Sequence, residues 1–177
     1  YRNSTKNMEK ISRSEEAVDS LRTAITNYLV EIMQQELSAD ESRKIPALIH
    51  AVNDAERIGD HAENLRDLVE QKIERSLPLS SEALAELKSM GSDIDGMISC
   101  SIAALSSNNL DEAKKVFQQE CRINTMRDKL KNNHVKRLEQ GSCNVLSGVI
   151  FLDTISNLEK IGDHLNNVAQ AVTEVLQ

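Results

Sequence analysis

Aromatic side chains are scarce in this 177-residue chain, which has two Phe, two Tyr and no Trp. Glycine and proline are also few, with six and two residues. Sheet proteins rely on aromatic and β-branched residues, whereas a composition rich in Leu, Ala, Ile, Glu and Lys favours helices. The composition therefore predicts an all-α fold, in a chain long enough to bury a core.

Cysteines and positive charge are also in short supply. Cys100, Cys121 and Cys143 are odd in number and form no Cys-x-x-Cys pair, so neither a disulfide framework nor a zinc knuckle is predicted. The formal net charge is −7 and no basic cluster is present, so we expect no nucleic acid partner.

Long apolar runs are absent as well. None approaches the ~20 residues that span a bilayer, and we expect no signal peptide before the first helix. The chain starts at Tyr1 rather than Met, so we expect it to be part of a larger or processed protein.

A repeated motif is the main feature that is present. Residues 56–61 read Glu-Arg-Ile-Gly-Asp-His, and residues 159–164 read Glu-Lys-Ile-Gly-Asp-His. Aligning residues 52–65 with 155–168, an offset of 103, gives six identities in fourteen positions. Internal repetition of this kind predicts two copies of one structural unit.

Apolar periodicity divides the chain into five expected helices. They cover residues 7–36, 39–75, 81–106, 110–140 and 142–176. Ser38 and Glu41 have the spacing of a capping box at the start of the second helix, and Gly141 is placed to end the fourth. Pro46 predicts either a start nearer Ile45 or a bend.

The break at residues 76–81 predicts a boundary between two repeats. The first repeat covers residues 1–77 and holds two long helices, and the second covers residues 78–177 and holds three. If the unit is an antiparallel three-helix bundle, the first copy lacks its opening helix.

Each copy of the motif places two carboxylates four residues apart on one helix face. These pairs are Glu56 with Asp60, and Glu159 with Asp163. Like charges at this spacing repel each other, so the presence of the same pair in both copies indicates a cation between the two carboxylates. Gly59 lowers helix propensity by ~1 kcal/mol relative to Ala, and its benefit would be close approach by a neighbouring helix or ligand.

A metal ion needs four to six oxygen ligands, so a second helix must contribute. In the first half, Glu15 and Asp19 form a further pair that an antiparallel hairpin would bring opposite the motif. In the second half, the residues at an offset of 105 are Glu120 and Asn124. The predicted metal ligands are therefore Glu15, Asp19, Glu56, Asp60, Glu120, Asn124, Glu159 and Asp163. Because asparagine brings no charge, we expect the second site to be weaker.

His61 and His164 occupy matching positions in the two motifs. Each lies about 100° around the helix from the preceding Asp. We therefore predict that they are helix-surface residues or neighbours of the ligands, rather than ligands.

The acidic residues have two other interpretations. They could be solvated surface charges of a structural helical adaptor, whose acidic patches bind a partner protein rather than metal. They could also belong to a di-iron carboxylate enzyme, but such sites need Glu-x-x-His pairs, and no histidine here follows a Glu at that spacing. No Gly-rich phosphate loop or nucleophile elbow is present, so we expect no catalytic residues and no enzyme.

Residues 53–61 resemble the signature helix of PhoU-like proteins, the phosphate-uptake regulators, and residues 14–21 resemble the preceding metal-motif helix. The resemblance implies a repeat of two antiparallel three-helix bundles that carry multinuclear metal clusters. It also implies a non-enzymatic regulatory domain for phosphate uptake. We expect iron as the metal, with zinc, nickel, manganese and magnesium as alternatives.

The sequence is most similar, within that family, to the cytosolic C-terminal domain of bacterial sodium/phosphate cotransporter-related proteins. This implies a transmembrane phosphate transporter portion or subunit as the partner. It also implies a cytoplasmic location, at the inner face of the membrane if the domain is attached to a transporter. The open apolar face of the first repeat predicts a homo-oligomer as well.

Overall fold

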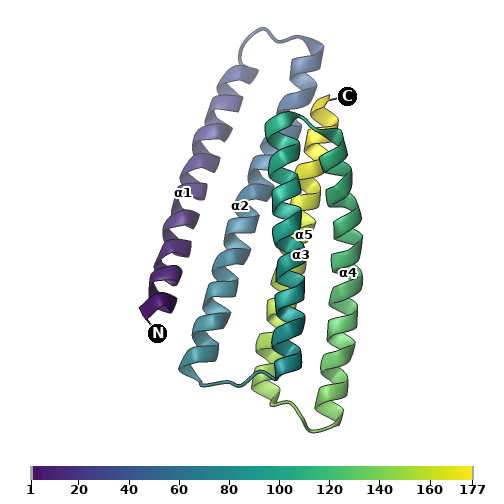
Figure 1. Ribbon diagram of the computed structural model, residues 1–177. Helices are drawn as coiled ribbons and strands as arrows, with labels where there is room; N and C mark the ends of the chain where they lie inside the picture. The colour runs from purple at the N-terminus through teal and green to yellow at the C-terminus, as the bar shows by residue number, and fades with distance from the viewer. Residues whose placement is uncertain (1, 177) are drawn as a thin grey trace.

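The computed structural model describes residues 2–176, with side chains for residues 7–175, and contains five helices (Figure 1). The helices are α1 (Arg2–Met33), α2 (Ala39–Glu74), α3 (Ser81–Ser107), α4 (Leu110–Glu139) and α5 (Val145–Leu176). No strand occurs within the described residues. The predicted all-α class and the order of the five helices are confirmed.

Local end signals set most of the helix boundaries. The Ser38 hydroxyl accepts a hydrogen bond from the Glu41 N–H, and the Glu41 carboxylate accepts one from the Ser38 N–H, which completes the predicted capping box. Gly141 follows α4 with a φ of +66°, a conformation that glycine adopts without steric cost. α5 begins three residues later than predicted because the Asn144 side chain accepts hydrogen bonds from the N–H groups of Leu146 and Ser147.

Both predicted ends of α1 and one alternative for the start of α2 were wrong. α1 starts at Arg2 rather than Asn7 and ends at Met33 rather than Glu36. α2 begins at Ala39 and continues through Pro46, so a start near Ile45 is wrong. Proline costs one helix hydrogen bond at that position, and the capped first turn keeps the preceding residues helical.

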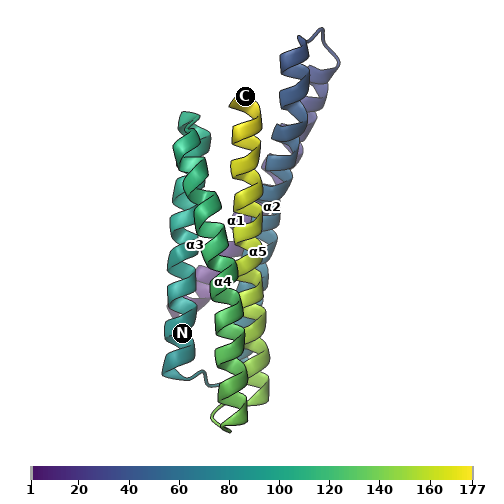
Figure 2. The same cartoon turned by 90° about the vertical axis from the view of Figure 1, so that its right-hand side faces the viewer.

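The helices form one bundle and one hairpin that pack along a single seam. α3, α4 and α5 pack against one another, and α1 and α2 form an antiparallel hairpin (Figures 1 and 2). The hairpin contacts the bundle through α2, which lies antiparallel to α5, and among the described helices α1 packs only on α2. We refer to α1–α2 as the first repeat and α3–α5 as the second; the division at residue 77 stays a prediction.

The main core lies inside the second repeat. Its fully buried side chains include Met90 and Met97 of α3, Val116 and Ile123 of α4, and Phe151 and Ile155 of α5. The first repeat buries few apolar side chains, among them Leu29, Ile45, Ala47 and Ala51.

No helix in the described part of the chain has an 18-residue stretch apolar enough to cross a membrane.

Candidate functional site

The first acidic site lies between α1 and α2. A Cβ built on Gly59 would lie 3.8 Å from both Glu15 Cγ and Val18 Cγ1, so α1 passes directly over this glycine. The hairpin therefore brings the Glu15 pair of α1 opposite the motif of α2, as the sequence predicts.

Charge crowding at this site acts on Glu15. Partial burial raises the pKa of its carboxyl group, and the neighbouring carboxylates of Asp19, Glu63 and Asp60 raise this pKa further. Among the described side chains, no Lys, Arg or His forms an ion pair with Glu15. The acids that raise this pKa come from both helices, in agreement with the close approach of α1 to Gly59.

The other first-site carboxylates are held by basic residues of their own helices. Arg57 lies 3.2 Å from Asp60 Oδ2 and 3.9 Å from Glu56 Oε2, and Arg66 lies 2.6 Å from Glu63 Oε1. Glu63 is an acidic neighbour of Glu15 that the sequence analysis did not select. Its position three residues after Asp60 was the available signal, because such residues share a helix face.

The second acidic site, between α4 and α5, contains its own cations. Arg127 of α4 donates to Glu159, which is 6% exposed. The Lys160 ammonium lies 2.7 Å from Asp163 Oδ2 and 3.4 Å from Glu159 Oε2. These contacts neutralise the motif carboxylates of the second repeat without any ligand.

Glu120 and Asn124 also lie next to each other on α4. The Asn124 amide donates to Glu120, while the Asn124 carbonyl oxygen is buried and accepts no hydrogen bond. An orphaned buried oxygen of this kind is a group that a cation or a donor would satisfy.

The eight predicted residues are divided equally between the two repeats. Glu15, Asp19 and Asp60 lie near one another in the first repeat, whereas the grouping of Glu120 and Asn124 with Glu159 and Asp163 stays a prediction. As the side chains lie, no group of three or more His, Cys, Asp or Glu residues in the described part of the chain is arranged to surround a metal ion. The first set offers four carboxylates, and Glu15 among them has no cationic partner, which fits an oxygen-preferring divalent cation. The second set fits less well, because Arg127 and Lys160 already bind its acids.

The two motif histidines meet where α2 crosses α5. The rings of His61 and His164 stack with their centroids 5.5 Å apart. His61 Nδ1 lies 2.8 Å from Asn157 Oδ1, and His164 Nδ1 lies 2.7 Å from Asp54 Oδ1. Both histidines are half-buried in the contact between the repeats rather than on an open helix surface, and their predicted role as neighbours of metal ligands stays a prediction.

These contacts repeat with the internal symmetry of the chain. Asp54 and Asn157 occupy matching positions, as do the two histidines, so each motif contacts the other repeat.

The model of the PhoU domain family matches residues 1–69 and 87–172 of this chain.

This chain belongs to the PhoU domain family. A PhoU homolog of Clostridium acetobutylicum, named a phosphate-specific transport system accessory protein, is 26% identical over 165 residues, which cover 92% of this chain and 74% of that protein. The putative inorganic phosphate export protein YjbB of Salmonella typhimurium is 22% identical over 159 residues, which cover 89% of this chain and 29% of that protein.

Solved PhoU structures share the fold. The crystal structure of PhoU from Pseudomonas aeruginosa matches with a TM-score of 0.87 and 22% identity, covering 96% of this chain and 80% of that one. The crystal structure of PhoU from Streptococcus pneumoniae matches with a TM-score of 0.84 and 19% identity, and the match covers 99% of this chain and 82% of that one. The PhoU-like helical fold predicted from residues 14–21 and 53–61 is therefore confirmed.

The PhoU relatives are named as accessory proteins rather than enzymes, in agreement with the prediction that this chain is not an enzyme.

Proposed function

We propose that the chain is a non-enzymatic regulatory domain of phosphate uptake that binds metal between α1 and α2. The observation that carries this proposal is the approach of the Glu15 pair to the motif of α2 over Gly59, in a chain of the PhoU family. The repulsion that raises the pKa of Glu15 supports a cation at this place, because a bound cation would relieve it.

Glu15, Asp19, Glu56 and Asp60 would hold the metal, with iron as the expected ion and zinc, nickel, manganese and magnesium as alternatives. When bound, the cation neutralises the carboxylates and links α1 to α2. The chain's own residues set the conditions for binding, since Gly59 admits α1 and no basic side chain among those described pairs with Glu15. Glu120, Asn124, Glu159 and Asp163 would form a weaker site.

The partner in this proposal is a phosphate transporter in the membrane. The chain would be the cytosolic part of a sodium/phosphate cotransporter-related protein, or would act on such a protein at the inner face of the membrane. YjbB supports this arrangement, because the matching region is only 29% of a protein named for phosphate export.

Elemental analysis tests the metal part of the proposal. The parent protein, purified without chelator or metal-affinity resin, is compared with Glu56→Ala/Asp60→Ala and with Glu159→Ala/Asp163→Ala. We expect near-stoichiometric metal in the parent, a large loss in the first variant and a small loss in the second. A folded parent without metal, even after incubation with iron, would overturn the metal proposal.

A structural adaptor is the second candidate, favoured by the ion pairs of Arg127 and Lys160 that satisfy the second site. In an adaptor, Glu56→Ala/Asp60→Ala would leave stability unchanged or slightly raised at every metal concentration, because like-charge repulsion is relieved. In the metal-binding domain, the same variant loses the stabilisation that added metal gives the parent.

A further inference from the structure

Of the five described helices, α4 alone has a net positive charge. It contains eight Lys and Arg residues and five Asp and Glu residues, whereas acids are at least as many as bases in each of the other four. Four of the α4 cations recur at every seventh position, and they are Lys115, Arg122, Lys129 and Lys136. Seven residues are close to two helical turns, so these side chains share one face. We call this line of residues the α4 cation stripe.

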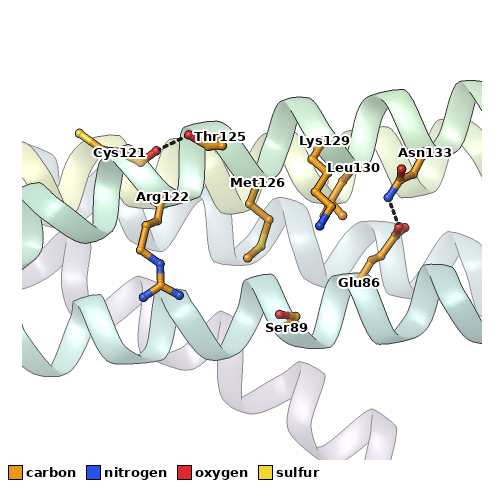
Figure 3. Close-up of a pocket in the computed structure, with 9 residues that line it drawn as sticks. All are labelled: Glu86, Ser89, Cys121, Arg122, Thr125, Met126, Lys129, Leu130 and Asn133. Carbon is orange, nitrogen blue, oxygen red and sulfur yellow. Dashed lines mark hydrogen bonds between the residues drawn. The ribbon is translucent and has the colours of Figure 1, made fainter.

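The stripe borders a groove between α3 and α4. The groove has a volume of about 550 Å³, and its apolar lining comes from Met126 and Leu130. In Figure 3, Arg122 and Lys129 extend from α4 toward α3, where the small side chain of Ser89 lines the opposite wall. The groove therefore combines an apolar lining with cations along one side.

Part of the charge of the stripe has no partner. Arg122 lies 3.2 Å from Asp93 of α3, and Lys115 forms an ion pair within its own helix. Lys129 and Lys136 are exposed and form no ion pair with any described side chain. A ligand of the groove therefore meets uncompensated positive charge on the α4 side.

The α3 side of the groove has the opposite charge. This helix contains four acids and a single lysine. One of the acids, Glu86, accepts a hydrogen bond from Asn133 at 2.7 Å, as Figure 3 shows, and lies 2.9 Å from Arg137. The acids of α3 are thus held against α4, and they leave the α3 side without free cations.

This asymmetry distinguishes between possible ligands. A membrane surface or a nucleic acid is anionic throughout, so the acids of α3 would repel it while the stripe attracts it. A helix can carry acids along one edge only, and it can therefore face the stripe without placing acids against α3. The charge pattern thus favours a helix over a continuous polyanion.

The spacing of the stripe also suits a helix. Successive cations are separated by a rise of about 10.5 Å, and the whole stripe is about 32 Å long. A helix packed alongside α4 presents every seventh residue at the same spacing, as in a coiled coil, where charged residues beside the apolar seam pair between helices. Acids at every seventh position of such a helix would each meet one cation.

We propose that the α3–α4 groove is the docking surface for an amphipathic helix of a different protein, with an apolar face on Met126 and Leu130 and an acidic edge on the α4 cation stripe. The inference goes beyond the proposed function, because neither the metal nor the transporter enters it. Within the described residues, α1 and α2 pack on neither α3 nor α4, so the groove is separate from the first acidic site.

Binding of a designed peptide tests the surface. The probe is a helical peptide of about 22 residues, the length of the stripe, with Leu at the two apolar positions of each heptad and Glu at one adjacent position. It is titrated into the 177-residue protein. Lys129→Glu/Lys136→Glu should weaken binding at least about tenfold, because the acidic edge then meets acids. A second peptide with Lys in place of Glu should bind this variant more tightly than the first peptide does.

Lys114→Glu/Lys131→Glu is the matched control, because both lysines are exposed on α4 outside the stripe and the change in net charge is the same. This variant should bind the Glu peptide about as tightly as the parent does. Absence of binding to the parent, equal weakening in the two double variants, or no recovery with the Lys peptide would overturn the docking surface.

Crosslinking in cells tests the partner. A photoreactive amino acid replaces Thr125, an exposed residue that lines the groove, in the full protein. The same replacement at Val135, an α4 residue that is 50% exposed and does not line the groove, is the control. We expect an adduct at Thr125 alone, with a helix of another protein whose sequence has acids at seven-residue spacing, and its loss in the Lys129→Glu/Lys136→Glu background. An adduct with lipid, with a second copy of this chain or with another part of the same polypeptide, or no adduct at all, would overturn the proposal.

Discussion

His164 Nδ1 lies 2.7 Å from Asp54 Oδ1, although 110 residues separate the two positions in the chain. The Asn167 amide donates to the same carboxylate oxygen at 3.0 Å. Asp54 thus receives two side chains of the second repeat, while its counterpart Asn157 faces His61. The second copy of the motif therefore helps to hold the first repeat in place.

Replacing Asp54 tests this role. Asp54→Ala removes the acceptor for His164 and Asn167, and we expect it to lower the free energy of unfolding by about 1–3 kcal/mol. Asp54→Asn copies the residue that the second repeat carries at this position, so it should lose clearly less. Urea denaturation of both variants measures the difference. Equal stability of Asp54→Ala and the parent would show that the contact does not join the repeats.

Removing the charge of Glu15 should have opposite effects on stability and metal binding. The folded-state pKa of Glu15 is raised above its ordinary value of 4.5. The protonated side chain therefore stabilises the fold below pH 4.5, and this stabilisation is lost as the pH rises through the folded-state pKa. At neutral pH the carboxylate is therefore unfavourable in the metal-free protein. Glu15→Gln should raise the metal-free melting temperature and weaken metal binding at least about tenfold.

Glu9→Gln is the matched control for this experiment, because Glu9 is an exposed acid of α1 with Arg13 at 4.0 Å. Glu9→Gln should change neither the metal-free melting temperature nor the metal affinity. Calorimetry of the chelated protein measures the first, and a metal titration measures the second. Unchanged metal affinity in Glu15→Gln would remove Glu15 from the predicted ligand set.

Gly148 should not tolerate a side chain. A Cβ at this position would lie 2.5 Å from Cε1 and 2.6 Å from Nε2 of His134, a buried ring that also packs on Phe151. Gly148→Ala should therefore cost about 1–3 kcal/mol of stability. Gly91→Ala is the control, because nothing lies within 4 Å of its Cβ position, and it should gain up to about 1 kcal/mol. Equal gains in both variants, measured by urea denaturation, would contradict the contact with His134.

His134 should make stability depend on pH. Burial lowers the pKa of His134, and the nearby Arg137 lowers it further, whereas Glu86 raises it. The unfolded chain takes up a proton at the ordinary pKa of 6.5 and the folded chain does not, so stability falls as pH drops through 6.5 toward the lower folded-state pKa.

The matched variant for this measurement is His134→Leu, because α1 carries Leu29 at the corresponding position. Melting temperatures are recorded between about pH 8 and about pH 5.5, the range in which histidine titrates. The parent should lose stability toward the acidic end by more than His134→Leu does. Parallel curves for the two proteins would assign the pH dependence to other groups.

The helices, and the approach of the Glu15 pair of α1 to the motif of α2, could be predicted from the sequence because the signals for both are local. The capping box of Ser38 and Glu41 and the left-handed Gly141 involve residues within one turn of each other. The repeated motif and the Glu15 pair have regular spacings along single helices, and a hairpin fixes which of them meet. The end of α1 had no such signal, which explains the error there.

The contacts between repeats could not be predicted in the same way. A helical wheel gives the direction of His61 around its own helix, but not which helix it meets, and Asn157 lies 96 residues away. Arg127 likewise carries no sequence signal that distinguishes it from the other charged residues of α4, although the fold places it next to Glu159 of α5. Such pairs depend on how α2, α4 and α5 pack, which is a property of the whole chain.

Because α1 packs on a single described neighbour while α5 packs on three, the ends of the chain differ in how firmly they are held. Local opening needs least free energy where few apolar contacts must be broken. Backbone amides of α1 should therefore exchange with solvent deuterium well before those of α5. We therefore expect the domain to open first at α1, so a metal ion or partner that binds across α1 and α2 would lengthen the lifetime of the closed form.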